Sequence, residues 1–580
     1  MKVRVLPPDL ASAFANLKGA LWTVGLASGV INLLALTGSF YMLQVYDRVL
    51  SSHSVPTLLA LSALAFGLYA IQGVLDIIRG RLLTRIASRV DRRLTVPAHT
   101  AALRMPLYGR STSEALQPLR DVEAIRSFVG GQCLVALIDL PWFPLYLAFV
   151  FLLHAWLGWV ATIGAVILIG VALLTEWLTR EISQQSSVAS ASRLAIAEAN
   201  VRNAEVLCAM GFGRRALDRY AKANAAYLNP YQRMSDTLGS LGGISKVLRL
   251  ILQSGILGLG AYLTLMGELS AGAIVAASIA SSRALAPIEM AIANWKAFAA
   301  ARLSHARLAA VIAAVPVPKD DPLPLPAPTR ALILEGVTVP IPGTQRVVLN
   351  NVSFTLRAGQ GVGIVGPSAA GKSTLARAMI GIWPLARGTV RIDGATLDRW
   401  SDEALGRHVG YLPQDVELFD GTIAENISRF EAGADPAAIL AAANAAQVHD
   451  MILGLPQAYE TPVGDRGRHL SAGQRQRIAL ARALYGEPFL VVLDEPNSNL
   501  DAEGEAALSQ AIADVRARGG IAVVIAHRPA VLAAVDMLCV LGGGRTTAFG
   551  PREDVLRRAV KTQASAAPSA ALALVSDNSV

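Results

Sequence analysis

The sequence predicts a multi-domain membrane protein: an all-α transmembrane domain of six helices, followed by an α/β domain built around a phosphate-binding loop. Three observations support this fold class. Of the 580 residues, 53% are hydrophobic and only 16% are charged. The first half of the chain contains six long apolar runs. The second half contains the pattern G-x-x-x-x-G-K-S between an apolar run and a helix-forming segment.

The composition and charge exclude several classes of protein. A mean hydropathy of +0.44 is far above that of an ordinary soluble protein. The net charge of +9 fits basic cytoplasmic loops better than a nucleic-acid partner, because the arginines cluster in loops next to the apolar runs. The three cysteines, Cys133, Cys208 and Cys539, form no C-x-x-C pair, so we expect neither a disulfide framework nor a zinc site.

The first apolar run, residues 21–45, predicts a membrane helix rather than a signal peptide. It contains no charged residue, is too long for a signal peptide, and precedes no small-residue cleavage site. The mildly basic residues 1–18 before it are too few for an additional protease-like domain.

All six runs are near the length of about 20 residues that crosses the hydrocarbon of a bilayer. The loops after the second and fourth runs are long, and ten arginines between Arg79 and Arg126 crowd the first of them. The positive-inside rule therefore predicts that this loop, both termini and the domain after the sixth run are cytoplasmic. The runs lie near residues 21–45, 55–78, 131–153, 157–178, 247–266 and 271–293.

The two long loops show helical periodicity; for example, Leu116, Leu119, Val122 and Ile125 recur at spacings of three and four. We expect cytoplasmic extensions of the membrane helices with a short cross-helix at each tip, near 111–122 and 203–213. These tips could dock on the α/β domain and couple the two domains. The alternative is a solvated helical hairpin with no coupling role.

Two charged residues lie inside apolar runs. Asp139 precedes Pro141 and Pro144, which we expect to kink their helix, and Arg283 lies in the sixth run. Charges at membrane depth usually face a cavity or pair with another charge, so Asp139 and Arg283 are candidates for lining a translocation path. Equally, each could lie at the cytoplasmic end of its span, where a charge costs little.

Composition marks the domain boundaries. Residues 315–328, VPVPKDDPLPLPAP, are proline-rich and predict a stiff, extended spacer. Strand-like and helix-like segments alternate after it, and the tail is rich in alanine and serine. The predicted division is therefore a transmembrane domain at 1–314, a linker at 315–330, an α/β domain at 331–563 and a flexible tail at 564–580.

The phosphate-binding loop lies between a predicted strand at 361–365 and a helix that we expect to begin at Thr374. Glycines at Gly366 and Gly371 allow backbone N–H groups to surround phosphate oxygens, and the helix N-terminus adds partial positive charge. We expect Lys372 to reach the β- and γ-phosphates and Ser373 to bind Mg²⁺.

A second motif supplies the acidic partners. The apolar strand 489–493 ends in Asp494 and Glu495. A carboxylate at the end of a buried strand beside a phosphate-binding loop is typical of a Mg²⁺ ligand, which assigns that role to Asp494. Glu495 is suited to act as a general base or to orient the attacking water.

Together with these motifs, Leu470-Ser-Ala-Gly-Gln474 followed by RQRIALARAL resembles the signature motif of ABC ATPases. Gln414 resembles the Q-loop glutamine, 498–501 the D-loop, and His527 the switch histidine of that superfamily. Residues 463–467, VGDRG, resemble a loop of exporters that senses the membrane domain.

The resemblance implies that two nucleotide-binding domains sandwich two ATP molecules between them, so that this half-transporter works as a C2 homodimer. It implies catalytic roles for Glu495, His527 and Gln414, and Mg²⁺ ligation by Ser373, Gln414 and Asp494. The residues implied to contact ATP are Gly366, Pro367, Ser368, Ala369, Ala370, Gly371, Lys372, Ser373, Thr374 and, from the signature and D-loop segments, Ser471, Gly473, Gln474 and Asp501.

Two positions depart from the superfamily pattern. Ala472 replaces the usual glycine of the signature, which would loosen the fit around the γ-phosphate. Ile341 occupies the position of an aromatic residue that stacks on adenine, so we expect apolar contact alone and weaker base selectivity.

Segments of the membrane half are similar to type I protein secretion exporters, in the branch that exports metalloproteases, lipases and haemophores. The similar segments are 41–50, 138–142, 203–206, 283–289 and 293–295. This resemblance implies a bacterial inner-membrane protein that exports unfolded proteins with an uncleaved C-terminal signal. It also implies a periplasmic membrane-fusion adaptor, an outer-membrane channel and contact with membrane lipids. Export of lipids or small molecules, or a membrane ATPase that transports nothing, are the alternatives.

Overall fold

The computed structural model describes residues 18–314, 325–344, 346–526 and 528–557. The chain divides into two compact units: Met1–Pro106 with Arg110–Val317, and Leu107–Gly109 with Pro318–Val580. The main boundary therefore falls inside the predicted linker. Most of that linker, and the predicted flexible tail, lie outside the described residues.

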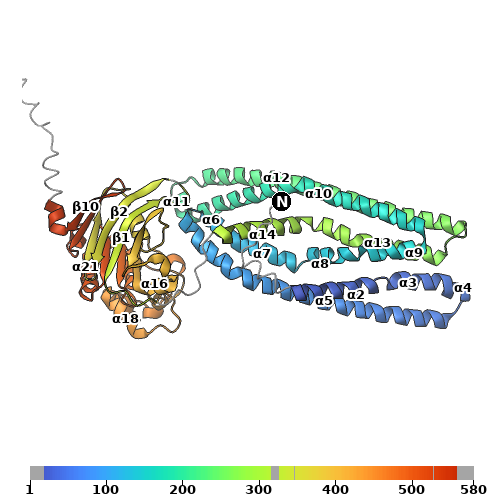
Figure 1. The fold of residues 1–580 in the computed structure, drawn as a ribbon, viewed down its shortest axis with the longest axis horizontal. Coiled ribbons are helices and arrows are strands. Elements are labelled where there is room, and N and C mark those ends of the chain that lie inside the picture. Colours follow the sequence, from blue (N-terminus) through green and yellow to red (C-terminus); the bar gives the residue numbers. More distant parts are fainter. Residues whose placement is uncertain (1–17, 315–324, 345, 527, 558–580) are drawn as a thin grey trace, which may run out of the picture. The chain divides into compact units, whose positions relative to one another are not determined.

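The first unit is entirely helical, and its longest helices lie side by side (Figure 1). Helices α10 and α12 pack along each other, as do α2 and α5. The elements are α2 (Lys18–Leu34), α3 (Thr37–Gln44), η1 (Val45–Val49), α4 (Leu50–Ser52), α5 (Val55–Arg104), η2 (Met105–Tyr108), α6 (Thr112–Ala115), α7 (Gln117–Val129), α8 (Gln132–Asp139), η3 (Leu140–Trp142), α9 (Phe143–Leu153), α10 (Ala155–Arg202), α11 (Ala204–Ala209), α12 (Gly213–Leu265), α13 (Ala271–Ala293) and α14 (Trp295–Ala314).

Each of the six predicted membrane runs lies within helices that are long and apolar enough to cross a membrane. Among the described residues a seventh segment, α14, also meets this criterion. It contains Lys296, Arg302 and Arg307, and Leu308 packs with Leu94 of α5 and Val122 of α7, which lie after the second predicted run. We therefore interpret α14 as an alanine-rich continuation of the sixth span rather than as another span.

The prediction that long loops extend the membrane helices agrees with the helix boundaries. Helix α5 continues to Arg104 and α10 to Arg202, while α12 begins at Gly213. A short helix lies at each predicted tip: α6, whose N-terminus has a capping box formed by Ser111 and Glu114, and α11. Docking of these tips on the α/β unit stays a prediction.

The expected proline kink is present in the third span. Helix α8 ends at Asp139, the 3₁₀ turn η3 follows, and α9 begins at Phe143. Pro141 lacks the N–H that a continuous helix needs, which explains why the helix is interrupted directly after Asp139.

The second unit contains two sheets with helices packed on them. A four-stranded antiparallel sheet has the order β2-β1-β4-β5, and a six-stranded sheet has the order β10-β9-β3-β8-β7-β6. The elements are β1 (Ala331–Pro340), β2 (Val347–Arg357), β3 (Gly361–Val365), α15 (Lys372–Met379), β4 (Arg387–Ile392), β5 (Ala395–Thr396), η4 (Leu397–Arg399), α16 (Asp402–His408), β6 (Val409–Leu412), α17 (Ile423–Ile427), α18 (Pro436–Ala445), α19 (His449–Leu453), η5 (Ala458–Glu460), η6 (Asp465–Gly467), α20 (Ala472–Leu484), β7 (Leu490–Asp494), α21 (Ala502–Ala517), β8 (Ile521–Ile525), α22 (Pro529–Leu532), β9 (Met537–Gly542) and β10 (Arg545–Pro551).

The six-stranded sheet places the motif residues at one edge. Strands β9, β3, β8, β7 and β6 are neighbours and parallel. The carboxyl ends of parallel strands meet at the same edge of a sheet, and ligands bind there in open α/β folds. The phosphate-binding loop follows β3, Asp494 ends β7, and Gln414 lies just after β6, so all of them gather at this edge.

Two apolar cores cover the faces of this sheet. Val362 and Ile364 of β3 pack with Leu334 of β1 and Leu375 of α15, between the two sheets. The other core joins β7 and β8 to the helices α17 to α21. Both faces of the central strands are therefore buried, which is why β7 and β8 consist of continuous apolar residues up to their last positions.

A buried ion pair joins α7 and α14 in the helical unit. The Asp121 side chain is 3% exposed, and Arg307 Nη2 lies 2.6 Å from its Oδ1. Arg307 also donates to Ser187 on α10 at 2.9 Å, and Gln117 donates to the same carboxylate. These bonds link three helices around one carboxylate that is removed from water.

We predict that Arg307→Ala lowers the stability of the detergent-purified chain by about 3 kcal/mol, because it leaves the Asp121 charge buried without its cation. The shift in melting temperature measures this loss. The matched control is Arg126→Ala, which removes exposed pairs with Glu123 and Asp91 and should leave the melting temperature almost unchanged. Equal effects of the two substitutions would contradict the importance of this buried pair.

Candidate functional site

The loop after β3 has the backbone shape of a phosphate cradle. Gly371 has φ +97° and precedes the first helical residue, so α15 begins at Lys372 and not at Thr374 as expected from the sequence. A Cβ at Gly371 would lie 2.8 Å from a Leu349 methyl carbon, and one at Gly366 would lie 2.3 Å from the Leu541 carbonyl oxygen. Glycine is therefore required at both positions by close packing, as well as by the backbone turn.

Lys372 is placed across this cradle. Its ammonium donates to the carbonyl oxygens of Gly366 (3.0 Å) and Pro367 (3.1 Å). Ser368 and Ala369 are exposed, and Ala369 has φ +63°, a conformation that costs a non-glycine residue energy. The lysine charge is thus held inside an open loop by weak neutral partners, and phosphate oxygens can replace them.

Ser373 and Asp494 meet beside the loop. The Ser373 hydroxyl donates to Asp494 Oδ1 at 3.1 Å. Asp494 is completely buried, and its second oxygen, Oδ2, has no hydrogen-bond partner among the residues that the structure describes. Burial raises the pKa of the Asp494 carboxyl, and the Ser373 hydrogen bond offsets only part of this effect. A buried carboxylate oxygen without a partner, next to a serine hydroxyl, fits a cation.

Glu495 lies one residue beyond the buried strand, where the backbone turns. It has φ +50°, an unfavourable conformation for glutamate that the sequence pattern does not reveal. Its carboxylate accepts a hydrogen bond of 2.9 Å from Gln414 Nε2. The predicted Q-loop glutamine and the predicted general base are therefore in direct contact.

Not every predicted site residue can be located. His527 lies outside the described residues. Ala370 and Thr374 are buried behind the loop, whereas Pro367 is exposed at its surface. The residues that the structure brings together in one chain are thus the loop with Lys372 and Ser373, Asp494, Glu495 and Gln414.

The predicted signature residues lie at the start of α20. Ser471 is the N-cap: its hydroxyl accepts from the Gln474 N–H, and the Gln474 side chain accepts from the Ser471 N–H. A Cβ at Gly473 would lie 3.0 Å from the Asn499 carbonyl oxygen, so glycine permits a close approach there. Ala472, the departure from the superfamily pattern, is exposed in the first turn. A capped helix N-terminus with an exposed serine suits an anion.

Asp501 proves to be the N-cap of α21 and is bonded by a residue that the sequence analysis missed. Its Oδ1 accepts from the Gly504 N–H (2.9 Å) and from Arg477 Nη2 (2.6 Å). These two donors hold the pKa of the Asp501 carboxyl below its usual range. Arg477 belongs to α20, so this pair links the signature helix to the predicted D-loop. The position of Arg477 within RQRIALARAL gave no indication of this bond.

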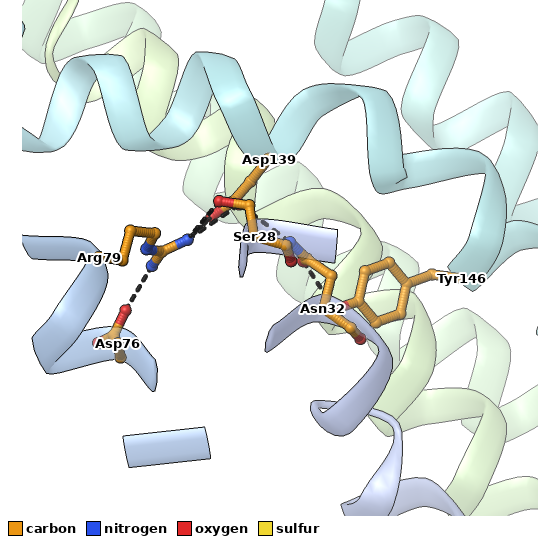
Figure 2. Close-up of polar contacts among 6 residues, drawn as sticks. All are labelled: Ser28, Asn32, Asp76, Arg79, Asp139 and Tyr146. Carbon is orange, nitrogen blue, oxygen red and sulfur yellow. Dashed lines mark hydrogen bonds and ion pairs between the residues drawn. The ribbon is translucent and has the colours of Figure 1, made fainter. Parts of the chain in front are cut away.

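In the helical unit, Asp139 has a partner that the sequence analysis did not identify. Arg79 Nη1 lies 3.0 Å from Asp139 Oδ1, and Asn32 Nδ2 donates to the same oxygen at 2.9 Å (Figure 2). Arg283 is exposed in the single chain. The proposed roles of Asp139 and Arg283 in lining a translocation path stay predictions.

The arrangement at the sheet edge is equipped for phosphoanhydride hydrolysis. The loop and Lys372 provide positive potential for a polyphosphate, and the Ser373–Asp494 pair provides a place for a divalent cation. Glu495, at a strand end beside them, can accept a proton from water, while Gln414 orients its carboxylate.

Comparisons with known proteins identify the family of the chain. Residues 349–498 match the family described as ABC transporter, and residues 21–284 match the ABC transporter transmembrane region. The chain is 52% identical over 555 residues to the type I secretion system ATP-binding protein PrsD of Rhizobium meliloti (strain 1021), covering 96% of this chain and 95% of that protein.

More distant relatives and a solved structure extend the comparison. The cyclolysin secretion/processing ATP-binding protein CyaB of Bordetella pertussis is 28% identical over 92% of this chain and 75% of its own length. The leukotoxin translocation ATP-binding protein LktB of Mannheimia haemolytica is also 28% identical, over 91% of this chain and 75% of its own length. A bacterial Atm1-family ABC exporter with ATP bound matches with a TM-score of 0.82 and 26% identity, covering 96% of this chain and all of that one.

We predict that Asp494→Asn raises the melting temperature of the nucleotide-free chain at pH ~8, because it removes a buried charge. Each kcal/mol of unfolding free energy gained in this way should raise the melting temperature by about 2–4 °C. The pKa of Asp494 is raised in the folded state. Its protonated form therefore contributes to the stability of the fold at low pH, and this contribution is lost as the pH rises through that pKa. The gain from the substitution should therefore shrink as the pH is lowered.

The control is Asp514→Asn on the exposed face of α21, where the carboxylate accepts only from Gln510. It should leave both the melting temperature and ATP hydrolysis unchanged, whereas Asp494→Asn should lose hydrolysis. A lower melting temperature for Asp494→Asn at pH ~8 would show that its charge is compensated in the nucleotide-free protein.

Proposed function

The chain belongs to the ABC transporter family, in its type I secretion branch, and on this premise we propose that two copies form an ATP-driven pump for unfolded proteins. The chain is a multi-pass membrane protein whose α/β unit binds ATP and couples ATP hydrolysis to transport. The observation that supports protein as the substrate is the 52% identity to a type I secretion protein along nearly the whole of both chains.

We further propose that the site works with Mg²⁺. The chemistry of the donor set fits: the Ser373 hydroxyl, the unpartnered Asp494 Oδ2, and the Gln414 amide nearby. Mg²⁺ prefers one or two protein oxygens together with phosphate oxygens, and when bound it neutralises charge on the β- and γ-phosphates. Lys372 would then leave the Gly366 and Pro367 carbonyls and bind phosphate oxygens.

Within this site Glu495 is the residue that we propose as the general base. Its backbone conformation at φ +50° directs it away from the buried strand, and its contact with Gln414 restricts the carboxylate. Proton transfer to a positioned carboxylate contributes roughly 10²–10⁴-fold to a rate. We propose that His527, on grounds of the sequence motif alone, contacts the γ-phosphate.

The signature residues support a homodimer as the working unit. Ser471, Gly473 and Gln474 would complete the ATP site of the other copy with a capped helix N-terminus, an arrangement suited to a γ-phosphate. One α/β unit follows one set of membrane helices in this chain, so a C2 dimer is the symmetric solution. The Arg477–Asp501 pair would hold the signature helix and the D-loop in a fixed relative position while two copies of the α/β unit close on ATP.

We place the pump in the bacterial inner membrane with the nucleotide-binding domain in the cytoplasm. The arginine-rich extension of α5 supports this orientation through the positive-inside rule. As a type I secretion component it would work with a periplasmic adaptor and an outer-membrane channel. The exported protein would carry an uncleaved C-terminal signal.

We predict that Glu495→Gln lowers ATP turnover by about 10²-fold or more, because the amide cannot accept a proton. In the parent bacterium it should remove one or a few large proteins from the culture medium and retain them in the cell with intact C-termini. Mass spectrometry of medium and cell fractions is the measurement.

Glu553→Gln is the matched control, because this glutamate is 73% exposed and pairs only with Arg557. It should leave turnover and the secreted proteins unchanged. An unchanged medium from an expressed, inactive Glu495→Gln chain would contradict protein export and favour a lipid or small-molecule substrate. Near-normal turnover would contradict the assignment of Glu495 as base.

A further inference from the structure

A polar cluster lies inside the apolar helical unit, at the junction of two groups of helices. It consists of Ser28 and Asn32 on α2, Arg79 on α5, Asp139 at the end of α8, and Tyr146 on α9 (Figure 2). We call this junction the Asp139 seam. It is separate from the ATP site and is not accounted for by ATP hydrolysis.

Apart from the bond of Arg79 to Ser28, which lies within the α2–α5 side, the long-range bonds of the cluster cross between the α2–α5 side and the α8–α9 side. Arg79 Nη1 donates to both Asp139 oxygens, at 3.0 and 3.1 Å. Asn32 Nδ2 donates to Asp139 Oδ1 at 2.9 Å, and the Tyr146 hydroxyl donates to the Asn32 carbonyl oxygen at 2.9 Å. The seam is therefore closed by polar bonds that are all broken together if these two sides separate.

Arg79 has a second carboxylate that stays with it. Its Nη2 donates to Asp76, one turn earlier on α5, at 2.5 Å, and its Nη1 also donates to Ser28 at 3.1 Å. The Asp76 side chain is 58% exposed, whereas that of Asp139 is 16% exposed. Arg79 can thus separate from Asp139 and still be paired with Asp76. A second arrangement, in which the Arg79–Asp139 pair is broken, is therefore available.

The helix on the α8–α9 side is interrupted at this point. Asp139 is the last residue of α8, and Pro141 in η3 prevents the helix from continuing. Proline is a usual cause of a sharp kink in a helix. The carboxylate that closes the seam therefore lies directly at the break between α8 and α9.

A close apolar contact between Gly29 and Trp142 also lies at the seam. A Cβ on Gly29 of α2 would lie 2.5 Å from Cζ2 of Trp142 in η3. Glycine lets the indole ring lie against the α2 backbone. A larger residue would force the Trp142 ring or one of the two sides to shift next to the ion pair.

From this geometry we propose that the Asp139 seam is a latch of the transport cycle. Arg79 and Asp139 hold the α2–α5 side to the α8–α9 side in the resting protein, and ATP drives the seam open as Arg79 passes to Asp76. Arg79 and Asp139 are positioning residues: they set the balance between two arrangements of the helices. The proposal rests on the proposed pump only in that ATP drives the opening, and it requires no particular cargo.

A purely static ion pair is the competing explanation, and general energetics disfavour it. Replacing a buried ion pair by apolar residues is often neutral or stabilising, so stability alone gives little reason for charges at this depth. Asp139 lies inside the third predicted run, and ionisable residues inside membrane segments usually mark function; Arg79 follows the second run directly. A static pair also has no need of the second acceptor, Asp76, or of a helix break at the carboxylate.

Thiol labelling tests whether the seam opens. Ser28→Cys places a near-isosteric thiol in the seam, in a full-length background carrying Cys133→Ala, Cys208→Ser and Cys539→Ala that retains ATP hydrolysis. Ser28 is 0% exposed, so a small methanethiosulfonate reagent should react slowly without nucleotide and about tenfold faster during ATP turnover in lipid vesicles. Ser39→Cys is the matched control, since Ser39 is also 0% exposed but lies on α3, away from the seam.

Equal protection of Ser28→Cys with and without ATP, while ATP is being hydrolysed, would overturn the proposal. Labelling needs ATP turnover but no exported protein. A failure of protein export in the parent bacterium therefore leaves this test intact. A failure of the latch likewise says nothing against protein export.

Weakening the latch gives a second, functional readout. Asp139→Asn removes the ion pair and Gly29→Ala wedges the seam at Trp142. Both should raise the cargo-independent ATPase rate by roughly tenfold, since charge-assisted hydrogen bonds of this kind are among the stronger ones. Gly25→Ala on the same helix is the matched control, because a Cβ there meets no atom within 4 Å.

The melting temperature separates a latch from a structural pin. If Asp139→Asn and Gly29→Ala lower both the melting temperature and the ATPase rate, the seam is a structural element and the proposal is wrong. If the rate rises in both variants, and Gly25→Ala stays at the original rate, the latch is supported.

Discussion

A carboxylate removed from water must have a compensating charge, and this constraint governs both units of the protein. Asp121 is paired with Arg307, and Asp139 with Arg79. Among the described residues, Asp494 accepts only a serine hydroxyl and keeps one oxygen without a partner. Two of the three carboxylates are therefore satisfied within the chain, and the third is the one that the proposed Mg²⁺ would compensate.

The same constraint explains how rigidity and mobility are distributed. Gln117 of α7 also donates to Asp121, and Ser187 of α10 accepts from Arg307, so this pair fastens α7, α10 and α14 together. The Asp139–Arg79 pair lies instead at a proline-interrupted helix and has an alternative acceptor in Asp76. The incompletely satisfied Asp494 is the place where ligand binding can contribute most to stability, because it removes an existing penalty.

The candidate site at the sheet edge was largely predictable because its motifs combine short-range sequence signals with a known strand arrangement. The phosphate-binding loop, Asp494 and Glu495 follow apolar strands that can be read directly, and the parallel order β3-β8-β7-β6 brings them together with Gln414. The helix start at Lys372 rather than Thr374 was missed, because Gly371 takes φ +97° and ends the loop earlier. The unfavourable φ of Glu495 and the Arg477–Asp501 bond have no local signal.

By itself, the sequence determined the membrane runs, the strand–loop–helix unit, the family resemblance and the proline break after Asp139, because these depend on residues close together in the chain. The tertiary structure decided which charges meet. Arg79 and Asp139 are 60 residues apart, and Asp121 and Arg307 are 186 apart. The sequence analysis used the ten arginines between Arg79 and Arg126 only to orient the chain, and the packing of α2 against both α5 and α8 brings Arg79 to Asp139.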